Sequence, residues 1–220
     1  MKRHTLSSLI IFLSGFLLVE AATITGQVDT SELPSQKRSS SRYNRGATEQ
    51  PSPPPSPRAV VYLEGEFAPE IWDAAPKNGQ LIQKGLQFKV SVLPITKGTM
   101  VVFPNEDNTF HNVFSYSPEK TFDLGRYRKG EDPGTQVFDK PGEIEVFCEI
   151  HRHMRSTILV LDSPIFTTAD ESGNFTLNDI PAGDYELVVW YAPGKTSRQP
   201  INVPAGESDL TVDLAKPTKN

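Results

Sequence analysis

Seven consecutive residues, Cys148-Glu149-Ile150-His151-Arg152-His153-Met154, place a thiol, two imidazoles and a thioether side by side. The rest of the chain is poor in all three groups. Cys148 is the single cysteine, and the only other methionines are Met1 and Met100. A concentration of soft donor groups of this kind predicts a metal site.

The strand expected at 143–148 points its thiol inward. A period of two places Cys148 on the same face as the apolar side chains and puts the two glutamates on the other face. The loop that follows can bring His151 and Met154 back towards the thiol. A fourth ligand must come from elsewhere in the sequence, and His111 is the remaining histidine beyond the N-terminal segment.

One thiolate, two imidazoles and one thioether are the ligand set of a blue-copper site, with a long, weak bond to the methionine. Three alternatives remain: a degenerate or empty site, a zinc site, and a Cys-His nucleophile. Zinc has little use for methionine, and a nucleophile lacks a visible orienting carboxylate or oxyanion hole. His153 is not expected to be a ligand, because neighbouring residues of a tight loop cannot all converge on one ion.

The segment from about 86 to 161 resembles a cupredoxin, the family of plastocyanin and amicyanin. His-Asn at an upstream strand edge and Cys-x-x-His-x-x-Met between the last two strands carry the resemblance, and the short ligand loop is most similar to that of amicyanin. The resemblance implies that Asn112 ties the upstream loop to the ligand loop by hydrogen bonding. It also implies one type 1 copper ion with four ligands: His111, Cys148, His151 and Met154.

The surroundings of the downstream histidine depart from this family. Short ligand loops in the family often carry proline or an apolar residue there, whereas Arg152, His153 and Arg155 surround His151 here. If the edge of the His151 ring passes electrons, as the resemblance implies, this basic rim favours an acidic redox partner.

The N-terminus predicts export. Basic residues at 2–4 precede an uncharged run at 5–19, and Val19-Glu20-Ala21 offers small residues at the positions that a signal peptidase reads. We therefore expect residues 1–21 to be a secretory signal peptide and the mature protein to be periplasmic or secreted. The apolar run is shorter than the roughly 20 residues that span a bilayer, so no integral membrane segment is expected in the mature protein. A lone cysteine in an oxidising compartment is best explained as a protected ligand.

Charge argues against nucleic acid as a partner. The chain carries 22 Lys plus Arg and 27 Asp plus Glu, and without residues 1–21 the balance is 20 to 26, a net charge of −6. Residues 31–58 carry a charge of +3 and are rich in proline and serine, which predicts a disordered, partly polyproline loop. Contact of this loop with a polyanionic cell envelope is a possibility, although a solvated linker is the simpler interpretation.

The remaining chain predicts an all-β fold, a cupredoxin Greek-key β-sandwich plus a second small β-sandwich after the signal peptide. Between 86 and 161 no stretch shows a convincing helical period. Short β-favouring runs separated by turn signals are expected to be strands at 23–28, 59–64, 86–93, 100–103, 112–115, 136–138, 143–148, 156–161, 166–169, 174–178, 185–191, 199–203 and 210–214.

The stretches 168–177 and 180–189 resemble the carboxypeptidase regulatory-like domain, a small transthyretin-like β-sandwich. The two opening strands of that family correspond to 24–28 and 59–63, ahead of the cupredoxin-like region. The resemblance implies an inserted cupredoxin, although strand 59–63 could instead complete the cupredoxin sheet. The expected division is signal peptide 1–21, regulatory-like parts 22–65 and 163–216, cupredoxin 66–162 and tail 217–220.

The sequence as a whole predicts an exported type 1 (blue) copper protein that transfers electrons by Cu(I)/Cu(II) cycling and is not an enzyme. The regulatory-like part holds no histidine, cysteine or clustered catalytic set, so we expect a scaffold or a contact module. Two alternatives stay open, a non-redox copper carrier or storage protein and a structural or adhesive β-protein with a degenerate metal site.

Overall fold

The structure is a computed structural model that describes residues 21–34, 52–53, 55–206 and 209–214. The expected signal peptide, apart from its last residue, and most of the proline-rich loop lie outside these residues, as does the expected tail. None of the helices in the described part of the chain has the length and apolar character needed to cross a bilayer.

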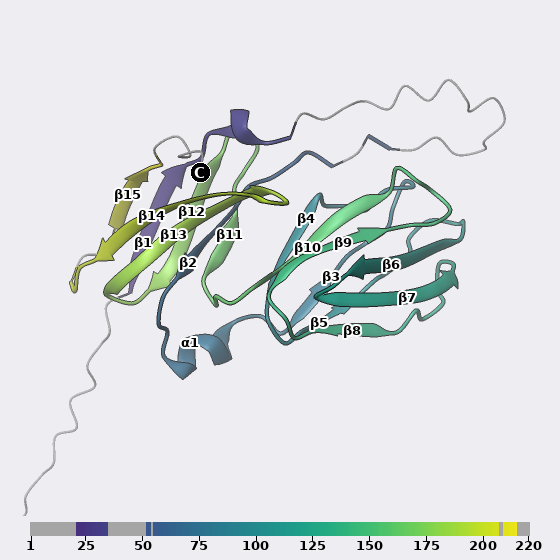
Figure 1. Ribbon diagram of the computed structural model, residues 1–220, viewed down its shortest axis with the longest axis horizontal. Coiled ribbons are helices and arrows are strands. Elements are labelled where there is room, and N and C mark those ends of the chain that lie inside the picture. The colour runs from purple at the N-terminus through teal and green to yellow at the C-terminus, as the bar shows by residue number, and fades with distance from the viewer. Residues whose placement is uncertain (1–20, 35–51, 54, 207–208, 215–220) are drawn as a thin grey trace, which may run out of the picture.

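The first sandwich is built from consecutive segments between residues 78 and 161 (Figure 1). Its larger sheet has the order β4-β10-β9-β6-β7, and its smaller sheet has the order β3-β5-β8. One apolar cluster, which includes Phe103, Ile144 and Ile158, fills the space between them. The strands are β3 (Asn78–Gln80), β4 (Val92–Thr96), β5 (Thr99–Val102), β6 (His111–Ser117), β7 (Lys120–Tyr127), β8 (Thr135–Phe138), β9 (Gly142–Phe147) and β10 (Arg155–Leu161).

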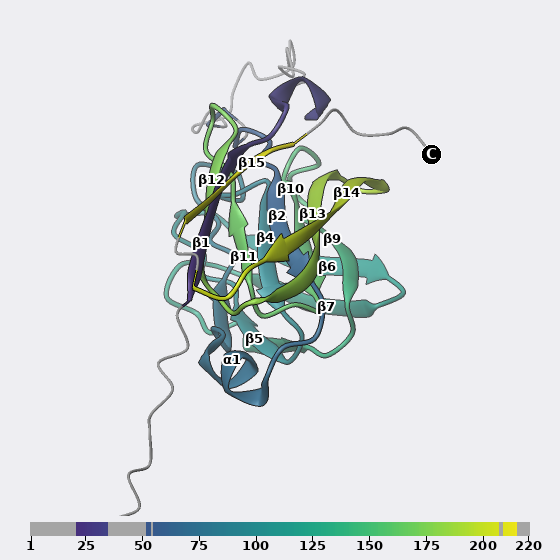
Figure 2. The same ribbon diagram turned by 90° about the vertical axis from the view of Figure 1, so that its left-hand side faces the viewer.

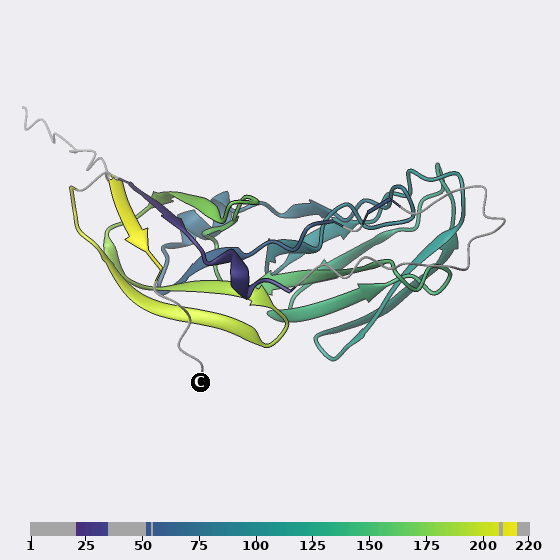
Figure 3. The same ribbon diagram turned by 90° about the horizontal axis from the view of Figure 1, so that it is seen from above.

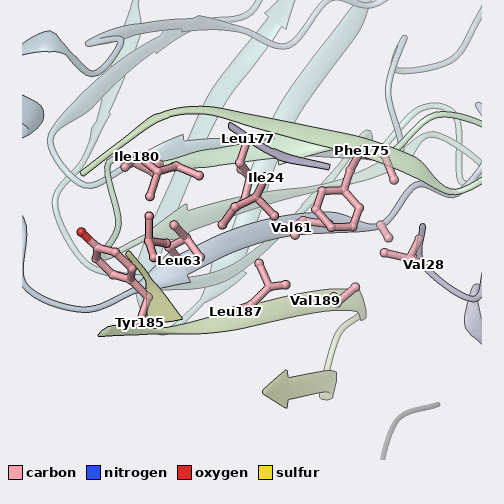
Figure 4. Close-up of a cluster of buried hydrophobic side chains, with 14 of the residues drawn as sticks. Ile24, Val28, Val61, Leu63, Phe175, Leu177, Ile180, Tyr185, Leu187 and Val189 are labelled. Atoms are coloured by element: carbon pink, nitrogen blue, oxygen red, sulfur yellow. The ribbon is translucent and has the colours of Figure 1, made fainter. Parts of the chain in front are cut away.

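The second sandwich combines strands that precede and follow the first. One sheet has the order β12-β1-β15 and the other β11-β2-β13-β14, and Figure 2 shows β1 between β12 and β15. Ile24, Leu63, Leu177 and Leu187 are fully buried between the two sheets (Figure 4). The strands are β1 (Ala22–Gln27), β2 (Val60–Glu64), β11 (Phe166–Thr168), β12 (Asn174–Ile180), β13 (Gly183–Ala192), β14 (Lys195–Val203) and β15 (Asp209–Asp213).

A third apolar cluster joins the two sandwiches, which lie side by side along the molecule (Figure 3). In β10, Ile158 faces the first core, whereas Leu159 and Leu161 face the second sandwich. Trp190 of β13 meets them and donates a hydrogen bond from Nε1 to Glu143 Oε1 at 2.6 Å. Strands β2, β10 and β13 are covered on both faces. This explains why their sequences contain consecutive apolar residues and do not alternate between apolar and polar side chains.

The predicted all-β class with two sandwiches is confirmed, but the bounds of one predicted strand are wrong and several short elements were not predicted. The strand expected at 86–93 begins only at Val92. The chain before it forms a tight turn, in which Gly85 and Leu86 have positive φ. The prediction missed β3, β7 and a short helix, α1 (Pro69–Ala74), which begins with proline at its first turn. A helix of six residues is too short for its periodicity to be recognised. A short 3-10 helix at Thr30–Glu32 was also missed.

The pairing of β2 answers the alternative left open for strand 59–63. β2 pairs with β11 and with β13, both antiparallel, and it makes no sheet with the strands of the first sandwich. Val60 lies opposite Trp190, and Leu63 lies opposite Leu187. The strand therefore belongs to the second sandwich.

Candidate metal centre

Cys148 lies in the core of the first sandwich at the end of β9. The alternation of this strand buries Ile144 and Val146 completely and leaves Cys148 with 3% of its surface exposed. Glu143 and Glu145 lie on the opposite face, as the period of two predicts. The thiol therefore occupies an apolar, water-poor position.

His111 is the first residue of β6 and is completely buried. Its Nδ1 lies 3.9 Å from Cys148 Sγ, and its Nε2 lies 2.9 Å from Asp107 Oδ2. The ring is thus fixed from both sides, with one nitrogen towards the thiol and the other towards a carboxylate.

His151 completes a compact group of three donors. Its Nδ1 lies 3.8 Å from Cys148 Sγ and 3.0 Å from His111 Nδ1. The donor atoms of the three residues all lie within 4.8 Å of one another. His151 is partly exposed, so it connects the buried group to the surface.

The ligand loop is closed by its own backbone. The Met154 N–H donates to the His151 carbonyl at 2.8 Å, and the Cys148 N–H donates to the Met154 carbonyl at 3.3 Å. Met154 is completely buried in the same apolar cluster as Cys148. Its side chain therefore lies in the same core as the thiol.

Asn112 connects the two segments that carry the histidines. Its Oδ1 accepts a hydrogen bond from the Glu149 N–H at 2.7 Å, and its Nδ2 donates to Asp123 Oδ1 at 3.2 Å. This buried amide joins β6 to the residue directly after Cys148.

The three residues of the predicted rim take different positions. Arg152 and Arg155 are exposed. His153 stands outside the three-donor group, and its Nε2 lies 2.9 Å from the Leu86 carbonyl. Two apolar side chains, Phe110 and Ile150, are each 39% exposed directly before a histidine of the group.

The electrostatics of the group favour a thiolate. Burial alone would raise the pKa of the Cys148 thiol, but contact with His111 and hydrogen bonds from neighbouring backbone groups lower the pKa overall. Burial alone would lower the pKa of His111, but its contacts with Cys148 and Asp107 raise the pKa overall. Burial, followed by the charge of His111, lowers the pKa of His151, which favours a neutral ring that can bind a metal.

Sequence reasoning missed Asp107, which is 9% exposed and holds His111. The signal available was an acidic residue four positions before a histidine. That spacing is informative in a helix, but Asp107 lies in the loop before β6 and His111 is the first residue of β6, so the spacing alone does not predict their contact.

Comparisons with known proteins give structural similarities alone. No family model matches the sequence, and no curated protein matches it. A Cu-containing nitrite reductase from Thermus scotoductus matches with 28% identity and a TM-score of 0.36, over 39% of this chain and 22% of the reductase. A purple cupredoxin from Nitrosopumilus maritimus matches with 22% identity and a TM-score of 0.34, over 38% of this chain and 99% of that protein.

Amicyanin from Paracoccus versutus matches with 18% identity and a TM-score of 0.34, over 41% of this chain and 88% of amicyanin. Each match covers about two fifths of this chain, and the matched part is only about a fifth of the reductase. The identities and TM-scores are low, so the chemistry of this protein has to be argued from its own donor groups.

Proposed function

We propose that this chain is an exported type 1 copper protein that transfers electrons and catalyses no reaction of its own. The observation that carries the proposal is the convergence of His111 Nδ1, His151 Nδ1 and Cys148 Sγ, at 3.0 to 3.9 Å from one another, inside an apolar core. Two imidazoles and one thiolate are the equatorial set of such a site.

The residues present fit copper better than the alternatives. Met154 follows His151 by three positions and is buried in the same apolar cluster as Cys148, and a thioether suits copper and not zinc. A copper ion bound there would supply one-electron chemistry by alternating between Cu(I) and Cu(II). His111 and Cys148 are anchored on β6 and at the end of β9, so the ligands stay in place in both oxidation states.

Absorption spectroscopy tests the metal assignment. Cu(II) added to the mature protein is expected to give an intense thiolate-to-copper band that Cys148→Ser abolishes. The absence of the band in the wild-type protein would contradict an electron-transfer site, and tightly bound, colourless Cu(I) that resists oxidation would indicate a carrier.

The role of the thioether is tested with a matched pair of variants. Met154→Leu is expected to change the reduction potential because the axial ligand is lost, whereas Met100→Leu, at a methionine that is 39% exposed, is expected to leave it unchanged. Equal potentials in Met154→Leu and the wild-type protein would remove Met154 from the ligand set.

The redox partner is proposed to be an acidic protein that approaches the partly exposed His151. Arg152 and Arg155 supply positive charge next to it. Charge reversal of both arginines is expected to slow electron transfer to an acidic partner at low salt, and the effect should shrink as salt rises. Lys77→Glu, at an exposed lysine beside α1, is the control, and equal rates for all variants would refute this orientation.

The export and the domain division of the sequence analysis are also proposals. The mature protein is placed in the periplasm or outside the cell. Residues 22–65 and 163–216 form one regulatory-like scaffold with 66–162 inserted, which is supported by the pairing of β1 with β12 and β2 with β13. N-terminal sequencing of the exported protein tests cleavage after Ala21.

A further inference from the structure

The turn at Lys84–Gln87 has an unusual backbone. Its two central residues, Gly85 and Leu86, have φ of 66° and 56°, and the Lys84 N–H donates to the Gln87 carbonyl at 2.9 Å. Two successive positive φ values are typical of the two-residue hairpin turn that favours Asn-Gly. Leucine is seldom found in that position, because its Cβ comes close to the following carbonyl oxygen. The surroundings must therefore hold Leu86 in place.

One partner of this turn is Asp107. Its Oδ1 accepts from the Gly85 N–H at 2.6 Å, and its Oδ2 accepts from the Leu86 N–H at 2.9 Å. The same Oδ2 lies 2.9 Å from His111 Nε2. An ionised carboxylate can only accept hydrogen bonds, so Nε2 carries the proton and donates it. This leaves His111 Nδ1, the nitrogen next to the thiol, for a metal.

A second partner of the turn is His153 in the ligand loop. Its Nε2 lies 2.9 Å from the Leu86 carbonyl, which can only accept, so His153 Nε2 is the donor. His153 directly precedes Met154, whose N–H donates to the His151 carbonyl at 2.8 Å. The backbone of Leu86 is thus connected to His111 through its N–H and to the ligand loop through its C=O.

We propose that the turn Lys84–Gln87 is a clamp that positions both histidine-bearing segments before a metal ion arrives. The purpose of the clamp rests on the proposed metal site, but its geometry involves no metal. Asp107 and His153 are positioning residues and not ligands, since Asp107 holds the His111 ring and His153 ties the ligand loop to Leu86. Outer partners of this kind commonly change metal affinity 10- to 100-fold when they are removed.

The first experiment needs no metal. Long-range ¹H–¹⁵N spectra of the metal-free mature protein, labelled with ¹⁵N-histidine, report which ring nitrogens carry protons. We expect protons on Nε2 of both His111 and His153, with slow exchange of the buried His111 proton. A bare Nε2 on His111 would overturn the clamp, whatever the protein does with copper.

The second experiment compares Asp107→Asn with Glu106→Gln. Glu106 is an adjacent carboxylate that pairs with Lys84 of the same turn at 2.8 Å. Co(II), which does not oxidise the thiol, is the probe. Asp107→Asn is expected to speed exchange of the His111 Nε2 proton and to weaken Co(II) binding about 10- to 100-fold, with Glu106→Gln close to the wild-type protein. Identical behaviour of the two variants would overturn the proposal.

A third comparison separates the clamp from general damage to the fold. The amide of His153→Gln can still donate to the Leu86 carbonyl, whereas His153→Ala cannot. We expect His153→Ala to weaken Co(II) binding several-fold and His153→Gln to restore most of the loss. Equal affinities in the two variants would remove His153 from the clamp. If Co(II) binds while the tautomers differ from those expected, the clamp fails and the metal site stands.

Discussion

Tyr62, in the contact between the two sandwiches, is expected to make the stability of the protein depend on alkaline pH. The side chain lies on β2 and is 8% exposed. Burial, followed by the negative charge of Glu64, raises the pKa of Tyr62 from 10.0 to about 12. The perturbation is Tyr62→Phe, which keeps the ring and removes the group that ionises.

The size of the effect follows from the pKa shift. One pKa unit corresponds to about 1.4 kcal/mol, so the whole shift corresponds to about 2.7 kcal/mol. The folded state disfavours the phenolate. The contribution of the neutral Tyr62 hydroxyl to the free energy of unfolding is therefore fully present below the unfolded pKa of 10.0 and is lost as the pH rises through about 12. By roughly pH 11.5 the free energy of unfolding of the wild-type protein should have fallen by about 2 kcal/mol through this ionisation, a decrease that the variant does not undergo.

Urea unfolding of Tyr62→Phe and the wild-type protein at several pH values provides the assay. At roughly pH 8 the variant should be about 1 kcal/mol less stable, because it lacks the polar interaction of the phenol hydroxyl with Glu64. By roughly pH 11.5 the order should reverse, with the variant about 1 kcal/mol more stable. Tyr116→Phe is the control, since Tyr116 is 77% exposed. Parallel profiles of Tyr62→Phe and the wild-type protein would refute the reasoning.

Three further substitutions test the packing and the ligand loop. Gly26→Ala would place a methyl group 2.6 Å from the Val212 carbonyl oxygen, so we expect a loss of about 2 kcal/mol in urea unfolding, and a neutral result would contradict the close approach of β1 and β15. Leu161→Ala, at a side chain 3% exposed between the sandwiches, is expected to cost about 2 to 5 kcal/mol by calorimetry, and an unchanged unfolding temperature would mean that the contact contributes nothing. Asn112→Ala leaves the Glu149 N–H without its acceptor, so we expect a loss of about 1 to 3 kcal/mol and faster hydrogen exchange of that amide, and unchanged exchange would exclude this link.

The sequence by itself determined the features that depend on local chemistry. The alternation of the strand before Cys148 predicts that the thiol faces the core, and the thiol is buried there. Residue types and turn signals also predict the all-β class and most of the strands. These features could be predicted because side-chain direction in a strand is fixed by the parity of the residue, whatever the rest of the chain does.

The tertiary structure alone decided which elements cover the strands that have two buried faces. Val60, Leu159 and Val188 lie in runs of consecutive apolar residues, which indicate burial on both faces but do not identify the elements that cover those faces. The structure shows that β2, β10 and β13 meet across the two sandwiches. No local pattern identifies the partner, because β2 and β13 are more than a hundred residues apart along the chain.

The surroundings of the three-donor group were also decided by the fold. Asp107 meets Leu86 from 21 positions away, and Asn112 meets Glu149 from 37 positions away. His153 contacts Leu86, which is 67 positions distant. The sequence establishes which groups are able to bind a metal, since that is a property of each side chain. Which groups hold those ligands in position depends on the packing of distant segments, and distance along the chain carries no information about it.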